Sequence, residues 1–186
     1  DVPPTLVSFA VDVAKEQDVI TPELKKAGNK LVLFTIDKNE YDLPVYEKVM
    51  ALYDSIHTLI GEGKILSAYA LDGKGLAAAV SKMAFGNKLG VTVEDSVSAD
   101  TLFAPGFGNI VAEVSEDALV AVLEKVPGAA VVATVNDTQN FNYKDMSISM
   151  EEALNTWTGT LERVFPTRAT EEKEEVKTDV FDTKEI

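Results

Sequence analysis

One stretch of this sequence combines an apolar run, two glycines and a helical pattern, an arrangement that many proteins use to hold a phosphate group. The apolar run covers residues 65–71, the turn Asp72-Gly73-Lys74-Gly75 follows, and residues 76–86 have a helical pattern. A helix N-terminus presents unpaired N–H groups and a partial positive charge, and glycines let the backbone approach a phosphate closely. Lys74 would add a point charge. The turn 72–75 is therefore our candidate nucleotide- or phosphate-binding site.

The same turn has a second interpretation that needs no ligand. Gly73 and Gly75 would make a tight connection between strand and helix, with Asp72 as the cap, and glycines alone favour this structural role. The turn is not a Walker A motif, which needs G-x-x-x-x-G-K-[ST]. It is not G-x-G-x-x-G either, because Ala78 stands in the place of the third glycine. Neither a P-loop NTPase nor a dinucleotide dehydrogenase is supported.

Other side chains with catalytic potential are few. The chain has no Cys, which excludes disulfides, thiolate zinc sites and Cys nucleophiles. The only His is His57, one position away from the apolar stripe of its helix, so we expect it on the flank of that helix. Asp12, Asp18 and Glu23 are expected to be solvated turn acids. We assign no catalytic residue and no metal ligand.

Two further segments allow more than one role. The segment 103–108, "FAPGFG", offers the N–H groups of Gly106 and Phe107 to an acceptor, or forms a plain bulged turn. Trp157 lies on the stripe of the last helix, where packing in the core or against another domain is expected.

Composition limits the class of protein. The chain has 186 residues, 46% of them hydrophobic, which is enough for one domain with a real core. The net charge of −14 disfavours nucleic acids and anionic lipid surfaces, and no apolar run is long enough to span a membrane. The opening "DVPPTL" lacks a Met and a signal-like region, so we expect a sequence that begins inside a longer chain.

Hydrophobic periodicity predicts an α/β domain of about five to seven strands and three or four helices. The strand at 30–36 is almost continuously apolar and should be buried on both faces. Ser115 and Ser149 are predicted helix N-caps. The predicted strands are 5–13, 30–36, 65–71, 89–93, 109–114 and 129–135, and the predicted helices begin near Pro44, Leu76, Ser115 and Ser149.

The composition changes near the C-terminus. Residues 169–186 are dominated by acids and lysines and have no apolar period. Such a segment cannot bury enough surface to offset its ordering entropy. We predict one domain over residues 1–168, followed by a disordered acidic linker at 169–186.

The segment "SAYALDGKGLAAAVSKMAFGNKLGV" resembles "HD-x-SDGGL…AEMAF…GI" of phosphoribosylformylglycinamidine synthase, a large glutamine-dependent ligase of purine biosynthesis. The segment "VPPTLVSFAVDVAKEQDVITPELKKAGNKLVL" is similar to the opening of the second C-terminal domain of the AIR synthase type in that enzyme. "LFAPGFGNIVAEVSEDALVAVL" and "MSISMEEALNTWTGTLERVFPTRA" resemble later parts of the same domain, in the same order. The resemblance covers almost the whole chain.

The resemblance implies a fold and a function. The fold is that of the AIR synthase C-terminal domain, a mixed sheet covered by helices with ferredoxin-like elements. The complete cytoplasmic enzyme uses ATP, magnesium and glutamine to convert formylglycinamide ribonucleotide into the amidine. Its partners would be AIR-synthase-type N-terminal domains and a glutaminase domain. The isolated domain would be inactive, would bind no cofactor firmly, and would expose an interface through which two copies could pair.

The resemblance transfers poorly at the level of single residues. Aligned without gaps, the family's His-Asp falls on Tyr69 and Ala70, and its Ser-Asp-Gly falls on Asp72, Gly73 and Lys74. In the family the first aspartate helps to hold magnesium and the serine lies at the nucleotide. Ala70 has no oxygen to offer a metal, so the resemblance implies that metal ligation there is lost. Two alternatives stay open: a C-terminal domain of a sister enzyme such as AIR synthase or selenophosphate synthetase, and a non-enzymatic interaction module.

Overall fold

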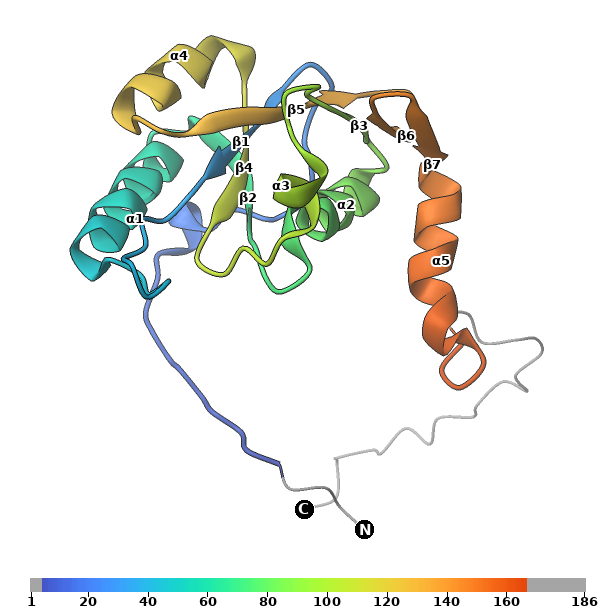
Figure 1. Cartoon of the computed structure of the whole chain (residues 1–186), viewed down its shortest axis with the longest axis horizontal. Coiled ribbons are helices and arrows are strands. Elements are labelled where there is room, and N and C mark those ends of the chain that lie inside the picture. Colours follow the sequence, from blue (N-terminus) through green and yellow to red (C-terminus); the bar gives the residue numbers. More distant parts are fainter. Residues whose placement is uncertain (1–4, 167–186) are drawn as a thin grey trace, which may run out of the picture.

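The computed structural model describes residues 5–166, which form a mixed sheet with helices on both faces (Figure 1). Helix α5 extends away from the sheet at one end, and the N-terminal segment extends away from its other side. The predicted acidic linker at 169–186 lies outside the described residues. Within residues 5–166, no helix has the length and apolar character needed to cross a membrane.

The order of the elements alternates strands with helices until a hairpin near the end. The strands are β1 (Lys30–Phe34), β2 (Ile65–Ala70), β3 (Gly90–Val93), β4 (Ile110–Val114), β5 (Ala130–Asn136), β6 (Asn140–Tyr143) and β7 (Met146–Ser149). The helices are α1 (Tyr46–Gly61), α2 (Gly75–Asn87), α3 (Ala99–Phe103), α4 (Glu116–Lys125) and α5 (Met150–Glu162), with a 3₁₀ turn at Glu16–Asp18.

The seven strands lie in the order β2-β4-β1-β5-β3-β6-β7. Neighbouring strands are antiparallel except β3 and β6, which are parallel. The unit β1-α1-β2 has β4 inserted between its strands, and the unit β4-α4-β5 has β1 inserted between its strands. Two interlocked split β-α-β units are the ferredoxin-like arrangement. The predicted mixed sheet with ferredoxin-like elements is therefore confirmed.

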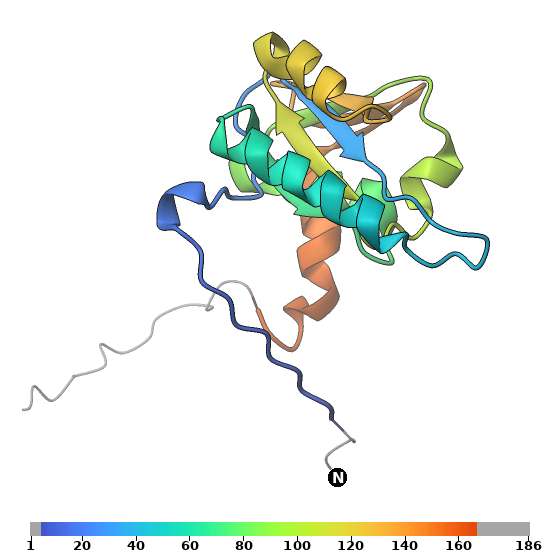
Figure 2. The same cartoon turned by 90° about the vertical axis from the view of Figure 1, so that its left-hand side faces the viewer.

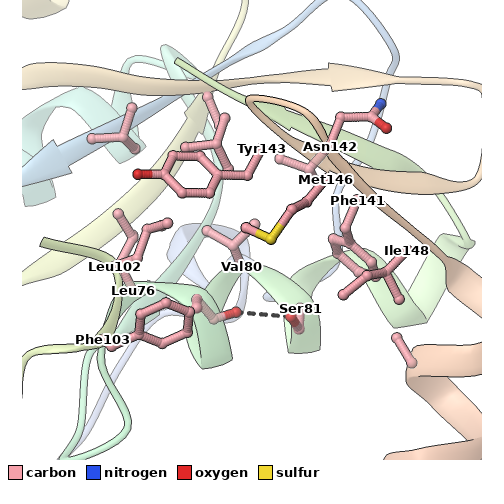
Figure 3. A pocket seen from close by; sticks show the side chains of 16 residues that line it. Leu76, Val80, Ser81, Leu102, Phe103, Phe141, Asn142, Tyr143, Met146 and Ile148 are labelled. Atoms are coloured by element: carbon pink, nitrogen blue, oxygen red, sulfur yellow. Dashed lines mark hydrogen bonds between the residues drawn. The ribbon is translucent and has the colours of Figure 1, made fainter. Parts of the chain in front are cut away.

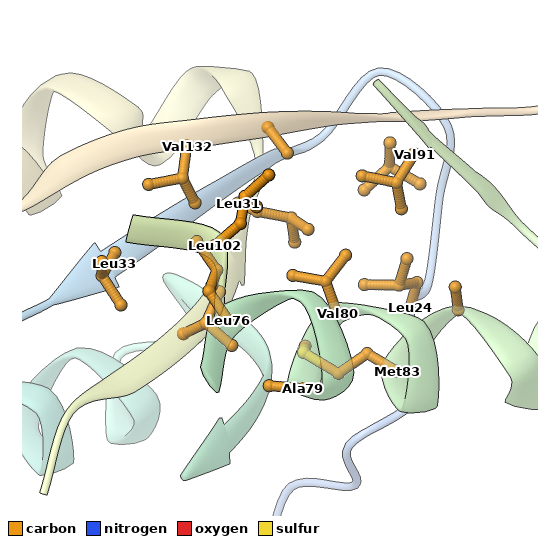
Figure 4. Close-up of a cluster of buried hydrophobic side chains, with 14 of the residues drawn as sticks. Leu24, Leu31, Leu33, Leu76, Ala79, Val80, Met83, Val91, Leu102 and Val132 are labelled. Carbon is orange, nitrogen blue, oxygen red and sulfur yellow. The ribbon is translucent and has the colours of Figure 1, made fainter. Parts of the chain in front are cut away.

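The central strand β1 has a separate hydrophobic core on each of its faces. Val32 and Phe34 pack in a cluster with side chains of α1 and α4, which lie on one face of the sheet (Figure 2). Leu31 and Leu33 point the other way, into a cluster with α2 and α3 (Figure 4). All four side chains are at most 8% exposed. This is the predicted burial of the 30–36 region on both faces.

Two predicted helix caps are found at their predicted positions. The Ser149 hydroxyl accepts a hydrogen bond from the N–H of Glu152 at 3.1 Å, as expected for the first turn of α5. Ser115 is the N-cap residue of α4, but its side chain makes no capping hydrogen bond.

The predicted strand at 5–13 is wrong. This segment is extended, but it is not among the strands of the sheet that the described residues form. Leu6, Phe9 and Val11 are 96%, 87% and 94% exposed. The alternation of apolar residues gives the segment strand propensity, but a strand forms only where a partner backbone takes up its N–H and C=O groups. The apolar residues of this segment alternate as in a strand, but their side chains are exposed to solvent.

Strands β6 and β7 and helix α3 were not predicted. The hairpin sequence, "NFNYKDMSIS", does alternate apolar and polar residues, but each of its strands has only four residues and neither has a fully buried side chain. Helix α3 has only five residues, too few for a helical period. Its N-cap is Ser98, whose hydroxyl accepts a hydrogen bond from the N–H of Thr101 at 3.1 Å.

Candidate functional site

The turn 72–75 joins the end of β2 to the start of α2, and it is held by hydrogen bonds centred on Asp72. The Asp72 carboxylate oxygen Oδ1 accepts a hydrogen bond from the N–H of Lys74 at 2.7 Å. The Asp72 carbonyl oxygen accepts from the N–H of Gly75 at 3.2 Å and from that of Gly106 at 3.0 Å. The Gly106 N–H, one of the two N–H groups of the 103–108 segment that the sequence offers to an acceptor, is therefore used inside the protein.

Both glycines of the turn lie against neighbouring protein atoms. Gly75 has a φ of +73°, and a Cβ built on it would lie 2.6 Å from the carbonyl oxygen of Ala104 and 2.8 Å from that of Leu102. A Cβ on Gly73 would lie 3.3 Å from the ring of Phe107. Only glycine fits at position 75, because both the left-handed backbone and the close approach exclude a side chain. The atoms that Gly75 approaches so closely are backbone atoms at the end of α3.

The four predicted residues Asp72, Gly73, Lys74 and Gly75 thus lie together in one turn at the start of α2. Lys74 is the N-cap residue, in place of the predicted Asp72, and its side chain makes no capping hydrogen bond. Gly73 and Lys74 are exposed, Asp72 is half-buried and Gly75 is buried. The exposed part of the turn that a ligand would meet is therefore Gly73 and Lys74.

Sequence reasoning missed a charged cluster beside this turn. Lys82 of α2 places its ammonium Nζ 3.2 Å from the hydroxyl of Tyr69 and 3.7 Å from Oδ2 of Asp72. The same ammonium lies 5.4 Å from the centre of the Tyr69 ring. The hydrogen bond to the Tyr69 hydroxyl, helped by the Asp72 carboxylate, raises the pKa of Lys82 above its ordinary value. The only sign of this cluster in the sequence was Lys82, the one charged residue in the helical segment "GLAAAVSKMAF".

An apolar pocket of about 260 Å³ lies beside the turn (Figure 3). Its wall includes Leu76 of α2, Phe103 of α3 and Met146 of the β6–β7 hairpin. The Ser81 hydroxyl in this wall donates to the Ala77 carbonyl at 2.8 Å, drawn as a dashed line in Figure 3. The Tyr143 hydroxyl donates to the Val97 carbonyl, also at 2.8 Å. Both hydroxyl donors are used internally, so the pocket offers apolar contact and no acid or base.

A buried carboxylate lies on the same face of the sheet, and it also went unnoticed in the sequence. Glu113 of β4 is 0% exposed and accepts hydrogen bonds from the backbone N–H groups of Lys25 and Lys26. The side chains of Asn29 and Ser67 donate to it as well, at 2.6 and 3.0 Å. Four donors satisfy this carboxylate, which fastens the 25–29 loop to the sheet. The only sign of this buried carboxylate in the sequence was that Glu113 is the one acid in the otherwise apolar strand "IVAEV".

The other acids and the histidine do not gather into a site. His57 is exposed on α1, as expected for a flank position. In the described part of the chain, no group of three or more His, Asp or Glu side chains could hold a metal ion.

Comparison with known proteins gives fold matches without a family assignment. No family model matches the chain. Phosphoribosylformylglycinamidine synthase II from Thermotoga maritima matches with a TM-score of 0.64 and 15% identity, over 91% of this chain and 31% of that one. T. maritima PurL complexed with ATP matches with a TM-score of 0.62 and 15% identity, over 75% of this chain and 28% of that one. E. coli HypE, a hydrogenase maturation protein, matches with a TM-score of 0.52 and 15% identity, over 72% and 52%.

These matches confirm the predicted resemblance at the level of the fold. The chain has the mixed α/β fold found in the phosphoribosylformylglycinamidine synthase structures. It spans about a third of the length of those proteins.

Proposed function

We propose that this chain is a domain of an ATP- and glutamine-dependent ligase that converts formylglycinamide ribonucleotide into formylglycinamidine ribonucleotide. The observation that carries the proposal is the fold match to the T. maritima synthase over 91% of this chain but 31% of that protein. In this proposal ATP, magnesium and glutamine are used by the complete cytoplasmic enzyme. The domain shapes one wall of a nucleotide site, next to the turn 72–75, and does not turn over alone.

The site geometry supports a scaffolding role for the domain. The turn 72–75 is fixed by hydrogen bonds from Asp72 and by the packing of Gly75, and the neighbouring pocket is apolar. The chain has no Cys, its only His is exposed on α1, and the one hydroxyl–carboxylate pair described above, Ser67 with Glu113, is 0% exposed and out of reach of a substrate. The reacting groups would therefore come from other domains.

Two exposed apolar surfaces support contact with other domains. Val7, Phe9, Val11 and Val13 alternate along the N-terminal segment and are 62–94% exposed. Such a segment can add as a strand to the edge of another sheet. On α5, Leu161 is 59% exposed. We assign these surfaces to AIR-synthase-type N-terminal domains and a glutaminase domain, and the N-terminal segment would pair two copies of an isolated domain.

A chimera tests the proposal. Residues 5–166 would replace the matching part of T. maritima PurL, and release of ADP would be measured with ATP, Mg²⁺, ammonium and formylglycinamide ribonucleotide. We expect ADP release that depends on the ribonucleotide from the chimera and none from the chain alone. A matched chimera with V7D and F9D should lose activity, because charges would break the contact of the N-terminal segment.

Two outcomes would contradict the proposal. Turnover by the chain alone would show that the domain is complete. A folded chimera that never hydrolyses ATP would show that the shared fold does not carry the shared role. The match to E. coli HypE favours a sister enzyme of the same fold as the second candidate. In that case the chimera would remain inactive with formylglycinamide ribonucleotide, and a HypE chimera would be the active one.

A further inference from the structure

Three side chains from different elements meet around one ammonium group beside the turn 72–75. Lys82 comes from the middle of α2, Tyr69 from the end of β2 and Asp72 from the turn. The ammonium faces a hydroxyl at 3.2 Å, a carboxylate oxygen at 3.7 Å and an aromatic ring whose centre is 5.4 Å away. The Lys82 side chain is 32% exposed, so part of its hydration is replaced by these protein groups.

A divalent cation does not fit the donor set at this place. The position aligned with the family's metal-holding aspartate is Ala70, which has no side-chain oxygen. Oδ1 of Asp72 already accepts the Lys74 N–H, and Oδ2 faces the Lys82 ammonium. Magnesium takes about six oxygen ligands in near-octahedral geometry, and this turn has one committed carboxylate to offer.

We infer that the Lys82 ammonium supplies the positive charge that a divalent cation would supply at this turn, and that the turn itself does not bind Mg²⁺. The inference rests on the proposed function in one respect, since only that function leads to the expectation of a metal here. A metal ion close enough to contact Asp72 would lie beside the ammonium and be repelled by it. The raised pKa of Lys82 keeps the ammonium charged through neutral and mildly alkaline pH.

Titration of the isotopically labelled chain with Mn²⁺ tests the inference without any measurement of activity. Mn²⁺ broadens the NMR signals of nearby amides, so the amides of Gly73, Lys74 and Gly75 report directly on the turn. For wild type we expect no more broadening there than at the exposed acids Glu116 and Asp117. The variant K82M, which removes the charge, should increase broadening at the turn at least fivefold, and K82R should behave as wild type.

Two results would overturn the inference. Saturable broadening of residues 73–75 in wild type with a micromolar dissociation constant would demonstrate a metal site. Equal broadening in wild type and in folded K82M would show that the lysine is not what keeps the metal away. If K82M does not fold, K82R and the wild-type titration still decide, because broadening that saturates in either one contradicts the inference. None of these outcomes depends on the chimera assay, so the inference and the proposed function fail separately.

Discussion

Ser67 and Glu113 face each other across the antiparallel pair of β2 and β4, and the Ser67 hydroxyl donates to Oε2 of Glu113 at 3.0 Å. Both side chains are 0% exposed. The carboxylate also accepts two backbone N–H groups from the 25–29 loop, which precedes β1 in the chain. One buried acid therefore ties together the edge strand β2, its neighbour β4 and the loop that leads into the central strand.

The first prediction concerns this carboxylate. The substitution E113Q keeps the size of the side chain but replaces one acceptor oxygen by an NH₂ donor. Donors that now point at Glu113 would then lack an acceptor or meet another donor. We expect the free energy of unfolding to fall by about 2–4 kcal/mol. Urea unfolding followed by circular dichroism measures the change.

A matched control for E113Q is E124Q, at an exposed position of α4. It should change the free energy of unfolding by less than about 0.5 kcal/mol. Equal effects of the two substitutions would show that the Glu113 hydrogen bonds add nothing beyond the generic loss of a charge.

The second prediction concerns Gly75. The substitution G75A places a Cβ 2.6 Å from the Ala104 carbonyl oxygen on a backbone with a φ of +73°. We expect a loss of about 2 kcal/mol or more, because strain and overlap add. The control is G61A at the end of α1, where no atom lies within 4 Å of the added Cβ. That substitution should stabilise the protein by up to about 1 kcal/mol, and thermal melting compares the two.

The core of this fold was predictable from the sequence because its elements are long and strongly periodic. The 30–36 region was identified as a strand buried on both faces, and the helix after Pro44 has its buried positions Ile56 and Leu59 on the predicted stripe. Strand order was not predictable, since β1 pairs with β4 and β5, which lie far away in the chain. Pairing over such distances depends on tertiary contacts that no local pattern records.

The candidate site was predictable only in part. The turn 72–75 lies where the glycines placed it, between β2 and α2. The contact of Lys82 with Tyr69 joins residues 13 positions apart across a strand, a turn and a helix. Its existence depends on how α2 lies on the sheet, so the sequence alone could not reveal it. The N-terminal segment shows the converse case, in which a sound local pattern lacks the partner that would make it a strand.

The third prediction concerns the pH dependence of stability near Glu23. Hydrogen bonds from Lys25 and Thr21, each 2.5 Å long, hold the pKa of Glu23 at about 2, against an ordinary value of 4.5. Because the pKa is lower in the folded state, the stabilisation is fully present above pH 4.5. It is lost as the pH falls from about 4.5 to about 2.

An NMR titration of the Glu23 carboxyl group should therefore have its midpoint near pH 2. The variant K25A removes the largest cause of the shift and should move the midpoint upward, towards 4.5. A wild-type midpoint at 4.5 would mean that these hydrogen bonds do not persist in solution.

The fourth prediction concerns the attachment of α5 to the body of the domain. Trp157 of α5 stacks on Phe85 of α2, with ring centres 5.3 Å apart and planes 20° apart. Phe85 also meets Phe141 of β6 edge-to-face at 6.1 Å. The substitution F85A removes the ring that both neighbours contact. We expect a loss of about 1.5–3 kcal/mol and faster hydrogen exchange over 150–162, because α5 has few other contacts with the body.

The fluorescence of Trp157, the only tryptophan, gives a direct measurement of this attachment. In F85A its emission should shift to longer wavelength as water replaces the aromatic face. The control L161A lies on the same helix at a position that is 59% exposed, and it should leave both emission and hydrogen exchange unchanged. If L161A loosened α5 as much as F85A does, then Leu161 would have a contact of its own in solution. The stacked pair would then not be the main attachment of α5, and pairing of two copies through the exposed apolar face of this helix would be the explanation to test.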